Sequence, residues 1–382
     1  MISFPDTLTA LYIHWPFCPY RCRFCPFVAL ASHNQFMPTY HDALTHEVKN
    51  FAKKLDYKPD LTSIFLGGGT PSTYPDELLL DMTGILANVF VIDDSEITIE
   101  VNPGTVRPGQ LSSWERMGIN RLSIGVQTLN DIVLQRLNRR HTAHESLSLI
   151  KRASDRFDNL SVDLILGLPG VSTREWKETL RRIVSLPIKH LSLYFLTVHE
   201  TTPLYFDLRK GNVTLPLEDE MIDLYHWSAE FLDQEGLQRY ELSNFARPGY
   251  ESRHNKVYWQ RKPYKGFGLG ACSFDGTTRT ANEKNLSRYI EYMRSNQPAT
   301  VFEERLTTQQ VVMETMMLGL RCKEGVSLKD IAAHLKPDQR KQLRKRVTSL
   351  KNKNFIAERR GSIMLTPAGL VLENEIVTQL LR

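Results

Sequence analysis

The sequence predicts an α/β protein in which a partial (β/α)6 barrel precedes a small C-terminal winged-helix-like α+β domain. Two observations favour this fold class. Over the first 200 residues, short apolar runs rich in β-branched and aromatic side chains alternate with helical periodicity, which is typical of a parallel sheet covered on both faces. After about Thr307, three helical segments precede a β-wing, as in a winged helix. A doubly wound open sheet is the alternative for the first part.

Six strand-like runs define the predicted barrel, and each ends at glycine or polar turn residues. They are Leu11–His14, Ser63–Leu66, Ile97–Val101, Arg121–Val126, Ser161–Leu166 and Leu191–Leu196. Helical periodicity between them is clearest in Tyr40–Leu55 and Thr173–Leu186. In a barrel and in a doubly wound sheet alike, the chemistry lies at the C-terminal ends of the strands.

The pattern divides the chain into three predicted domains. Residues 1–200 form the core barrel, residues 201–300 form a barrel extension with a long helix near Glu218–Glu235, and residues 301–382 form the winged-helix-like domain. The elements expected in that last domain are helices at Thr308–Leu320, Ser327–His334 and Asp338–Asn352, a wing at Phe355–Leu365 and a final helix.

Composition favours a soluble cytoplasmic protein. The 382-residue chain is 41% hydrophobic, and its N-terminus lacks the basic and apolar regions of a signal peptide. No apolar run reaches the roughly 18 residues that span a bilayer. Its five cysteines are an odd number, and three of them fall within eight residues. In a reducing compartment such a group is more typical of a metal site than of a disulfide framework.

The three clustered cysteines, Cys18, Cys22 and Cys25, have the spacing C-x3-C-x2-C in a loop after the first strand. This spacing lets three thiolates face one centre. Iron–sulfur clusters and structural zinc sites ordinarily use four protein ligands. Because no fourth cysteine is nearby, we interpret the group as the ligands of a [4Fe–4S] cluster with one open iron. The alternative is a zinc loop completed by His14 or His33.

Polar residues also follow or interrupt the other predicted strands. Gly67–Thr70 follows the second strand, and such a loop either cradles an anion or carboxylate with its backbone amides or is a plain turn. Glu100 and Asp163 stand in apolar strands, where an unpaired carboxylate is costly to bury, so each reaches the site or forms a structural salt bridge. Gln127 and Arg139 fit the same pattern, with an exposed helix cation as the alternative for Arg139. We expect the strand-end residues to meet at one opening.

A second motif, His254-Asn-Lys-Val-Tyr-Trp259, lies in the predicted extension. An imidazole beside an aromatic pair suits a flat ligand such as heme, because imidazole is a common axial ligand of heme iron. A lone histidine is more often structural, so the residue chemistry leaves both interpretations open. Cys272 is a further candidate for a heme ligand, with a small buried residue as the alternative.

Together these strings resemble a known family. C-x3-C-x2-C after a strand that begins Tyr-Ile-His-x-Pro is similar to the radical S-adenosylmethionine (SAM) superfamily, and more closely to its oxygen-independent coproporphyrinogen III oxidase branch. Within that branch the chain most resembles the HemW heme chaperones, over about residues 9 to 375. The strings that narrow the resemblance are Leu66–Ser72, Glu100–Gly104, Ser123–Gln127, Asp163–Pro169 and His254–Trp259.

The resemblance implies a radical SAM barrel with a [4Fe–4S] cluster on Cys18, Cys22 and Cys25, SAM on the open iron, and heme at His254. An electron from such a cluster can cleave SAM. The residues that the resemblance matches to SAM contacts or places beside the cluster are Tyr12, Phe24, Gly68, Gly69, Thr70, Glu100, Gln127, Arg139 and Asp163. Tyr12 and Phe24 either shield the cluster and stack on adenine or serve only as packing.

Three departures from the resemblance bear on activity. Coproporphyrinogen oxidases of this branch carry a further cysteine two residues after the third, where this chain has Phe27, and a longer segment before the first strand. HemW chaperones commonly have histidine where this chain has Cys272. The expected function is a heme chaperone that passes heme to an acceptor hemoprotein and lacks coproporphyrinogen oxidase activity. A radical SAM enzyme acting on a tetrapyrrole is the alternative, so whether the protein is an enzyme stays open.

The expected partners are heme and an apo-hemoprotein such as a respiratory cytochrome subunit. Lys336–Arg360 holds ten Lys or Arg against two acidic residues, and basic helices attract phosphate. Aromatic residues are nearly absent there, so nucleic acid is not an expected partner, and a solvated face or a dock for an acidic protein is the alternative. Peripheral membrane contact and a homodimer stay open, while a transmembrane segment is not expected.

Overall fold

The computed structural model describes residues 8–381. Residues 1–7 of the predicted first domain and Arg382 of the predicted third domain lie outside the described residues. Part of the N-terminal segment in which a signal peptide is not expected lies outside them too.

The six predicted strands are present and lie parallel in one sheet. They are β1 (Ala10–Trp15), β4 (Ser63–Gly68), β5 (Glu96–Val101), β6 (Arg121–Gln127), β7 (Asn159–Leu166) and β8 (His190–Phe195). Their spatial order follows the chain, and every neighbouring pair is parallel. A doubly wound sheet would reverse its strand order at a switch point. The architecture is therefore the partial barrel.

The sheet extends at both edges with strands that the sequence analysis did not place. β11 (Tyr264–Phe267) pairs in parallel with β1, and β12 (Cys272–Phe274), β13 (Thr278–Asn282) and β14 (Thr300–Arg305) follow antiparallel. At the other edge, β10 (Asn244–Ala246) and β9 (Gln238–Arg239) add to β8. The twelve-stranded order is β14-β13-β12-β11-β1-β4-β5-β6-β7-β8-β10-β9.

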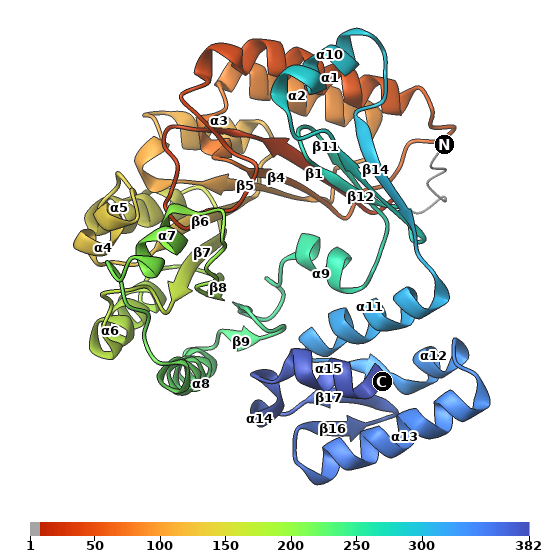
Figure 1. Cartoon of the computed structure of the whole chain (residues 1–382). Helices are drawn as coiled ribbons and strands as arrows, with labels where there is room; N and C mark the ends of the chain where they lie inside the picture. Colours follow the sequence, from red (N-terminus) through yellow and green to blue (C-terminus); the bar gives the residue numbers. More distant parts are fainter. Residues whose placement is uncertain (1–7, 382) are drawn as a thin grey trace.

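Helices cover the outside of this curved sheet, and Figure 1 shows α1, α2 and α10 grouped near β1, β4 and β11. The α-helices of residues 8–300 are α1 (Met37–Ala52), α2 (Asp76–Val89), α3 (Gln110–Arg116), α4 (Asp131–Arg136), α5 (Ala143–Ser154), α6 (Thr173–Val184), α7 (Pro203–Arg209), α8 (Glu218–Gln234), α9 (Arg253–Trp259) and α10 (Leu286–Arg294). Short elements between them are β2 (Phe17–Cys18), β3 (Leu30–Ala31), η1 (Asn34–Phe36), η2 (Pro71–Thr73) and η3 (Pro103–Thr105).

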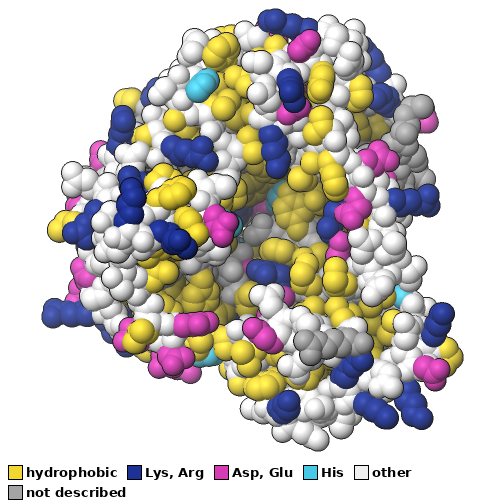
Figure 2. All heavy atoms as spheres, in the orientation of Figure 1, with side chains coloured by type: hydrophobic (Ala, Val, Ile, Leu, Met, Phe, Trp, Pro, Cys, Tyr) yellow, Lys and Arg dark blue, Asp and Glu magenta, His cyan; other side chains and the backbone are white. Residues whose placement is uncertain are grey.

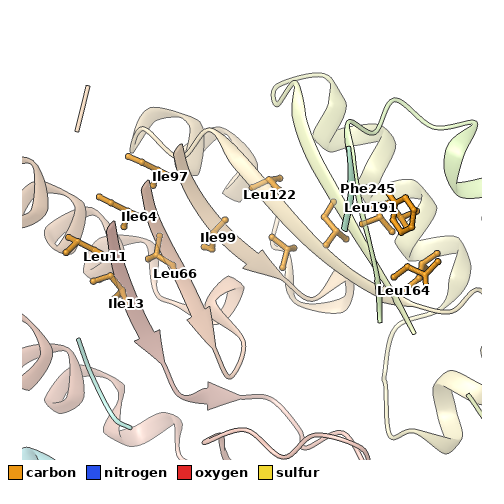
Figure 3. Close-up of a cluster of buried hydrophobic side chains, with 14 of the residues drawn as sticks. Leu11, Ile13, Ile64, Leu66, Ile97, Ile99, Leu122, Leu164, Leu191 and Phe245 are labelled. Atoms are coloured by element: carbon orange, nitrogen blue, oxygen red, sulfur yellow. The ribbon is translucent and has the colours of Figure 1, made fainter. Parts of the chain in front are cut away.

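Alternation along the parallel strands separates the hydrophobic core from the site. Figure 3 shows Leu11, Ile13, Ile64, Leu66, Ile97, Ile99, Leu122, Leu164, Leu191 and Phe245 in one buried cluster. Successive side chains of a strand point to opposite faces. Tyr12, Glu100 and Asp163, which are neighbours of these residues in sequence, therefore point into the barrel. The hydrophobic side chains of each strand form the buried core beneath the helices, and the side chains on the opposite face line the inside of the barrel.

The C-terminal region folds as the predicted α+β domain, at the lower right of Figure 1. Its elements are α11 (Thr308–Arg321), β15 (Val326–Ser327), α12 (Leu328–Ala333), α13 (Pro337–Asn352), β16 (Ile356–Arg359), β17 (Ser362–Leu365), α14 (Pro367–Leu370) and α15 (Glu373–Leu381). The strands form a separate sheet in the order β15-β17-β16. Within residues 8–381, no helix combines the length and apolar character of a membrane crossing.

Candidate functional site at the barrel opening

A cavity of about 490 Å³ lies at the C-terminal ends of the parallel strands, and we call it the first cavity. Its wall contains every predicted site residue except Tyr12, His254 and the further candidate Cys272. These wall residues are Cys18, Cys22, Phe24, Cys25, Gly68, Gly69, Thr70, Glu100, Gln127, Arg139 and Asp163. Figure 2 shows a hollow in the middle of the face that it draws, bordered by hydrophobic side chains and by some charged ones.

The three cysteines reach this cavity from the loop after β1. Cys18 is buried and accepts a hydrogen bond at 3.2 Å from the Thr70 hydroxyl, whereas Cys22 and Cys25 are half-exposed. Burial raises the pKa of the Cys18 thiol to about 11, although the Thr70 hydroxyl opposes this rise. In the described part of the chain, no three His, Cys, Asp or Glu side chains are grouped closely enough to hold a metal ion. The positions of the thiols therefore do not by themselves select a metal.

The two histidines considered as a fourth zinc ligand are placed elsewhere in the described part of the chain. Neither His14 nor His33 is on the wall of the first cavity. Both ring nitrogens of His14 are already engaged, Nδ1 with the Tyr12 hydroxyl at 3.0 Å and Nε2 with the Val28 carbonyl at 2.9 Å. His33 Nδ1 lies 2.6 Å from the Ala31 carbonyl.

The glycine loop after β4 packs against the segment that leads to Cys18. The Gly69 amide donates to the Trp15 carbonyl at 2.8 Å, and the Gly68 amide donates to the Glu100 carboxylate at 3.1 Å. Gly68 has a φ of +114°, and a Cβ there would lie 2.6 Å from the His14 ring. A Cβ on Gly69 would lie 2.4 Å from the Pro16 carbonyl oxygen. The loop requires glycine for packing as well as for any ligand.

Two carboxylates face the first cavity from β5 and β7. Burial, and then the charge of Asp163, raises the pKa of Glu100 to about 8. Burial also raises the pKa of Asp163, whose oxygens accept from the Ser123 hydroxyl at 3.0 and 3.3 Å. Neither carboxylate has a salt-bridge partner among the described residues. The structural salt bridge considered for each is therefore absent there, although the charges of Arg121 and Arg139 oppose the rise in the pKa of Asp163.

Arg139 lies in the loop between α4 and α5, half-buried against the cysteine loop. Its Nη2 donates to the Gly125 carbonyl at 2.5 Å, and its Nη1 lies 3.7 Å from the Cys22 sulfur. Its Nε is buried without a hydrogen-bond partner in the described part of the chain. The alternative of an exposed helix cation does not hold, because the side chain lines the first cavity and the residue is outside both helices.

Gln127 ends β6 in a conformation that a non-glycine residue rarely adopts. Its φ is +68°, and the register of β6 on β7 shifts between Gly125 and Gln127. Such a conformation costs on the order of 1–3 kcal/mol and is concentrated at functional sites. The strand bulge turns the Gln127 side chain toward the cavity wall.

Sequence reasoning missed a polar network on the same wall. Asn102 Nδ2 donates to the Tyr20 hydroxyl at 2.7 Å, and Asn102 Oδ1 lies 3.1 Å from His141 Nδ1. The position of Asn102 after β5 was the available signal, whereas Tyr20 and His141 carry no sequence signal of their own. Phe24 lines the cavity and also packs beside a small buried cluster that contains Leu137.

Tyr12 is not on the wall of the first cavity, and its expected place beside the cluster stays a prediction. Its hydroxyl pairs with His14, and its ring stacks on Phe65 with centroids 6.3 Å apart. It lines a separate hollow of about 250 Å³, the second cavity, together with Tyr258 and Cys272.

His254 is buried in α9, only 1% exposed, and lines neither cavity. Its Nδ1 lies 2.9 Å from the Ser63 hydroxyl, its Nε2 lies 2.8 Å from the Tyr258 hydroxyl, and its ring stacks on Phe65. Burial, and then the charge of Arg121, lowers the pKa of His254 to about 3. In this arrangement both nitrogens that could ligate iron are occupied, so heme ligation by His254 stays a prediction that requires rearrangement.

Comparison with known proteins defines the class first. A family model described as the Radical SAM superfamily matches residues 12–183, and one described as the HemN C-terminal domain matches residues 306–372. The solved structure of coproporphyrinogen III oxidase (HemN) from Escherichia coli aligns with a TM-score of 0.85 and 24% identity over 99% of this chain and 91% of that chain, a likeness of fold. The fold is that of a radical SAM protein.

Full-length relatives then define the family. The heme chaperone HemW of Bacillus subtilis is 33% identical over 372 residues, which cover 97% of this chain and 98% of that protein. The mouse mitochondrial radical S-adenosyl methionine domain-containing protein 1 is 34% identical over 338 residues, covering 84% and 75%. The heme chaperone HemW of Escherichia coli is 35% identical over 310 residues, covering 77% and 79%. The chain belongs to the HemW family of heme chaperones.

Proposed function

We propose that this protein binds heme and transfers it to an acceptor hemoprotein, on a scaffold that holds a [4Fe–4S] cluster and SAM. The observation that carries the proposal is the first cavity, in which three free thiols, a glycine loop and two carboxylates meet in a chain related to HemW along its length.

The residues of the first cavity fit the two cofactors that the superfamily implies. Cys18, Cys22 and Cys25 would hold the cluster, and the unpartnered Nε of Arg139 provides a buried donor beside them. Glu100 and Asp163 provide carboxylates for the cationic amine and the hydroxyls of SAM. When bound, the cluster supplies the electron that can cleave SAM. The residues of this chain orient SAM and exclude water around it.

The proposal includes a cellular compartment and a role for each of the three predicted domains. Free thiols in an open cavity require a reducing compartment, and we place the protein in the cytoplasm for that reason. Residues 1–200 would form the cofactor-binding core, residues 201–300 its extension and residues 301–382 the separate C-terminal domain. Because β9 to β14 pair within the core sheet, we do not expect the middle part to fold alone.

The test is an anaerobic reconstitution with iron and sulfide, followed by titration with hemin and incubation of the loaded protein with an apo-hemoprotein such as apomyoglobin. We expect about four irons per chain, saturable hemin binding and faster transfer than from serum albumin. Albumin loaded with the same amount of hemin is the control. No saturable hemin uptake, or robust conversion of coproporphyrinogen III by the pure protein with SAM, contradicts the proposal.

A further inference from the structure

The loop that carries the three cysteines has little regular structure of its own. Within the described part of the chain, residues 19–29 contain no helix or strand, and one backbone hydrogen bond joins two residues of this stretch, from the Cys25 amide to the Cys22 carbonyl at 3.3 Å. Three thiolates can hold one cluster only if their sulfur atoms keep their positions. The loop therefore depends on residues outside it.

One side of the cysteine loop is attached to the segment between α4 and α5. The Arg23 amide donates to the Leu137 carbonyl at 3.1 Å, and Asn138 Nδ2 donates to the Arg21 carbonyl at 2.8 Å. Asn138 has a φ of +61°, a conformation that asparagine adopts more readily than most residues. This attachment lies within the predicted core, residues 1–200.

The other side of the loop is attached to α7. The first amides of a helix have no hydrogen-bond partner within the helix, and in α7 the Leu204 amide donates to the Arg23 carbonyl at 3.0 Å. Asp207 lies one turn further along the same face of α7. Its Oδ2 accepts from Arg23 Nε at 3.2 Å and also from Arg23 Nη2. Both contacts meet the same residue, which stands between Cys22 and Cys25.

Arg23 is in turn the main attachment of α7. Among the described residues, every hydrogen bond between α7 and a residue outside 199–212 is made to Arg23. Leu204 is buried, whereas Phe206 on the same helix is 54% exposed. The short helix and the cysteine loop therefore position each other, and they join the predicted extension to the core.

The charge of Arg23 gives this attachment a second effect. A partly exposed ion pair adds little to the free energy of unfolding, and here the side chains are 40% exposed for Arg23 and 22% for Asp207. Arg23 directly follows Cys22 in the sequence. With Asp207 beside it, its positive charge is balanced. Without Asp207, one more uncompensated cation would stand near the thiolates.

We propose that the ion pair of Arg23 and Asp207 holds the cysteine loop against α7 and that Asp207 is a positioning residue for the cluster. This inference rests on the proposed function, since it concerns the [4Fe–4S] cluster that the scaffold holds. Asp207 acts through Arg23 and does not itself touch the cluster. Its loss should free the loop on the side of α7, and Cys22 and Cys25 are more exposed than Cys18.

The experiment compares the reconstituted full-length protein with variants of the pair. The first measurement is the rate at which iron is lost to an iron chelator under anaerobic conditions. We expect Asp207→Asn and Arg23→Gln to lose iron about tenfold faster than wild type, as when an outer partner of a metal ligand is removed. Asp207→Glu keeps the carboxylate and should restore the slow rate.

The second measurement is the midpoint potential of the cluster, from a redox titration followed by electron paramagnetic resonance. Asp207→Asn leaves the Arg23 cation without its partner, which favours the reduced and more negative cluster and raises the potential. Arg23→Gln leaves the Asp207 anion without its partner and lowers the potential. A pair that only stabilised the fold would not shift the potential in opposite directions.

Glu115→Gln is the matched control. Glu115 on α3 forms another partly exposed ion pair, with Arg156 at 2.8 Å, and neither residue is on the wall of the first cavity. The variant loses one negative charge and one ion pair between distant segments, as Asp207→Asn does. It should keep the wild-type rate of iron loss and the wild-type potential. Circular dichroism reports the folding of every variant.

The outcomes separate the inference from the proposed function. If wild type holds a cluster and Asp207→Asn matches it in iron loss and potential, the inference fails and the proposed function stands. The inference also fails if Glu115→Gln loses iron as fast as Asp207→Asn, or if the two variants of the pair do not shift the potential in opposite directions. If wild type itself assembles no cluster, the cluster in the proposed function and the inference fail together.

Discussion

The wall of the first cavity and the surroundings of His254 are both built from conspicuous sequence strings, yet they satisfy their polar atoms in opposite ways. In the first cavity, Arg139 Nε is buried without a hydrogen-bond partner in the described part of the chain. The Glu100 and Asp163 carboxylates accept hydrogen bonds from the Gly68 amide and the Ser123 hydroxyl, but no salt bridge there joins either of them to a cation. Around His254, both ring nitrogens are paired and the ring is stacked. Unsatisfied atoms beside a cavity are available to a ligand, whereas paired atoms in the core stabilise the fold.

The two regions also respond to pH with opposite sign. The pKa of Glu100 is raised by burial to about 8, so the folded state keeps a proton that the unfolded state loses from about pH 4.5, and stability falls as pH rises between these values. The pKa of His254 is lowered by burial to about 3, so the unfolded state takes up a proton below about pH 6.5, and stability falls as pH drops from there. Single variants can separate these two contributions.

Removal of one thiol should have the largest effect. Cys22→Ala leaves two thiolates, and we expect iron content after reconstitution to fall from about four per chain to below about one. Iron and sulfide assays with the absorption of the cluster measure this. Cys322→Ala is the control and should keep full iron content. A Cys22→Ala protein that retains its cluster would show that Cys22 is not a ligand.

His254→Ala should cause the second largest change, and it should be a change in stability. The variant loses two hydrogen bonds and a stacked ring in the core, which costs about 3 kcal/mol of the free energy of unfolding. Urea titrations at pH 7 and pH 5.5 measure the loss, which should be smaller at pH 5.5 because the variant no longer takes up a proton there on unfolding. SAM affinity should stay within about twofold. A large loss of SAM affinity at unchanged stability would show that His254 serves ligand binding and not the stability of the fold.

Glu100→Gln should increase the stability of the protein and decrease its affinity for SAM. At pH 7, we expect the free energy of unfolding of the cluster-free protein to rise by about 1–2 kcal/mol, because a neutral amide removes the cost of holding a carboxyl in this buried place. SAM affinity should fall about tenfold, since an amide cannot give up a proton to become a charged partner when the amine of SAM binds, as the carboxyl can. Asp158→Asn, a change at an exposed carboxylate, is the comparison. Lower stability together with unchanged SAM affinity contradicts a role for Glu100 in the site.

Tyr12→Phe should have the smallest effect and distinguishes the second cavity from the first. It removes the hydroxyl that pairs with His14, at a cost of about 1 kcal/mol. Because Tyr12 is outside the first cavity, SAM affinity should change less than twofold. Isothermal titration with SAM and thermal unfolding of the same samples provide the two measurements. A tenfold loss of SAM affinity would put Tyr12 beside the cluster after all.

Much of the architecture followed from sequence because it depends on local patterns. Apolar runs such as Ser161–Leu166 are long enough to specify buried parallel strands, and the ends of such strands meet at one edge of the sheet, which brought Glu100 and Asp163 together. The C-terminal helices were equally visible from their periodicity.

The parts that escaped prediction depend on contacts between distant segments. Tyr264–Phe267 and Thr278–Asn282 are short and half polar, and they are strands because an edge of β1 is available to pair with them. Sequence likewise could not tell that Tyr258 and not His254 would reach a cavity, because the two residues lie one turn apart on the same face of α9. The partner of a polar atom is set by tertiary packing.

The pairing of β11 with β1 has a consequence for synthesis on the ribosome. Thr9 donates two hydrogen bonds to the carbonyl of Pro263, 254 positions later in the chain. Translation proceeds at about 5–20 residues per second, so β11 is synthesised on the order of 10–50 s after β1. During that interval a nascent chain exposes an unpaired strand edge beside the cysteine loop, which is a template for association with other chains. The cysteine loop therefore reaches its final surroundings only after a segment about 250 residues further along the chain has been synthesised.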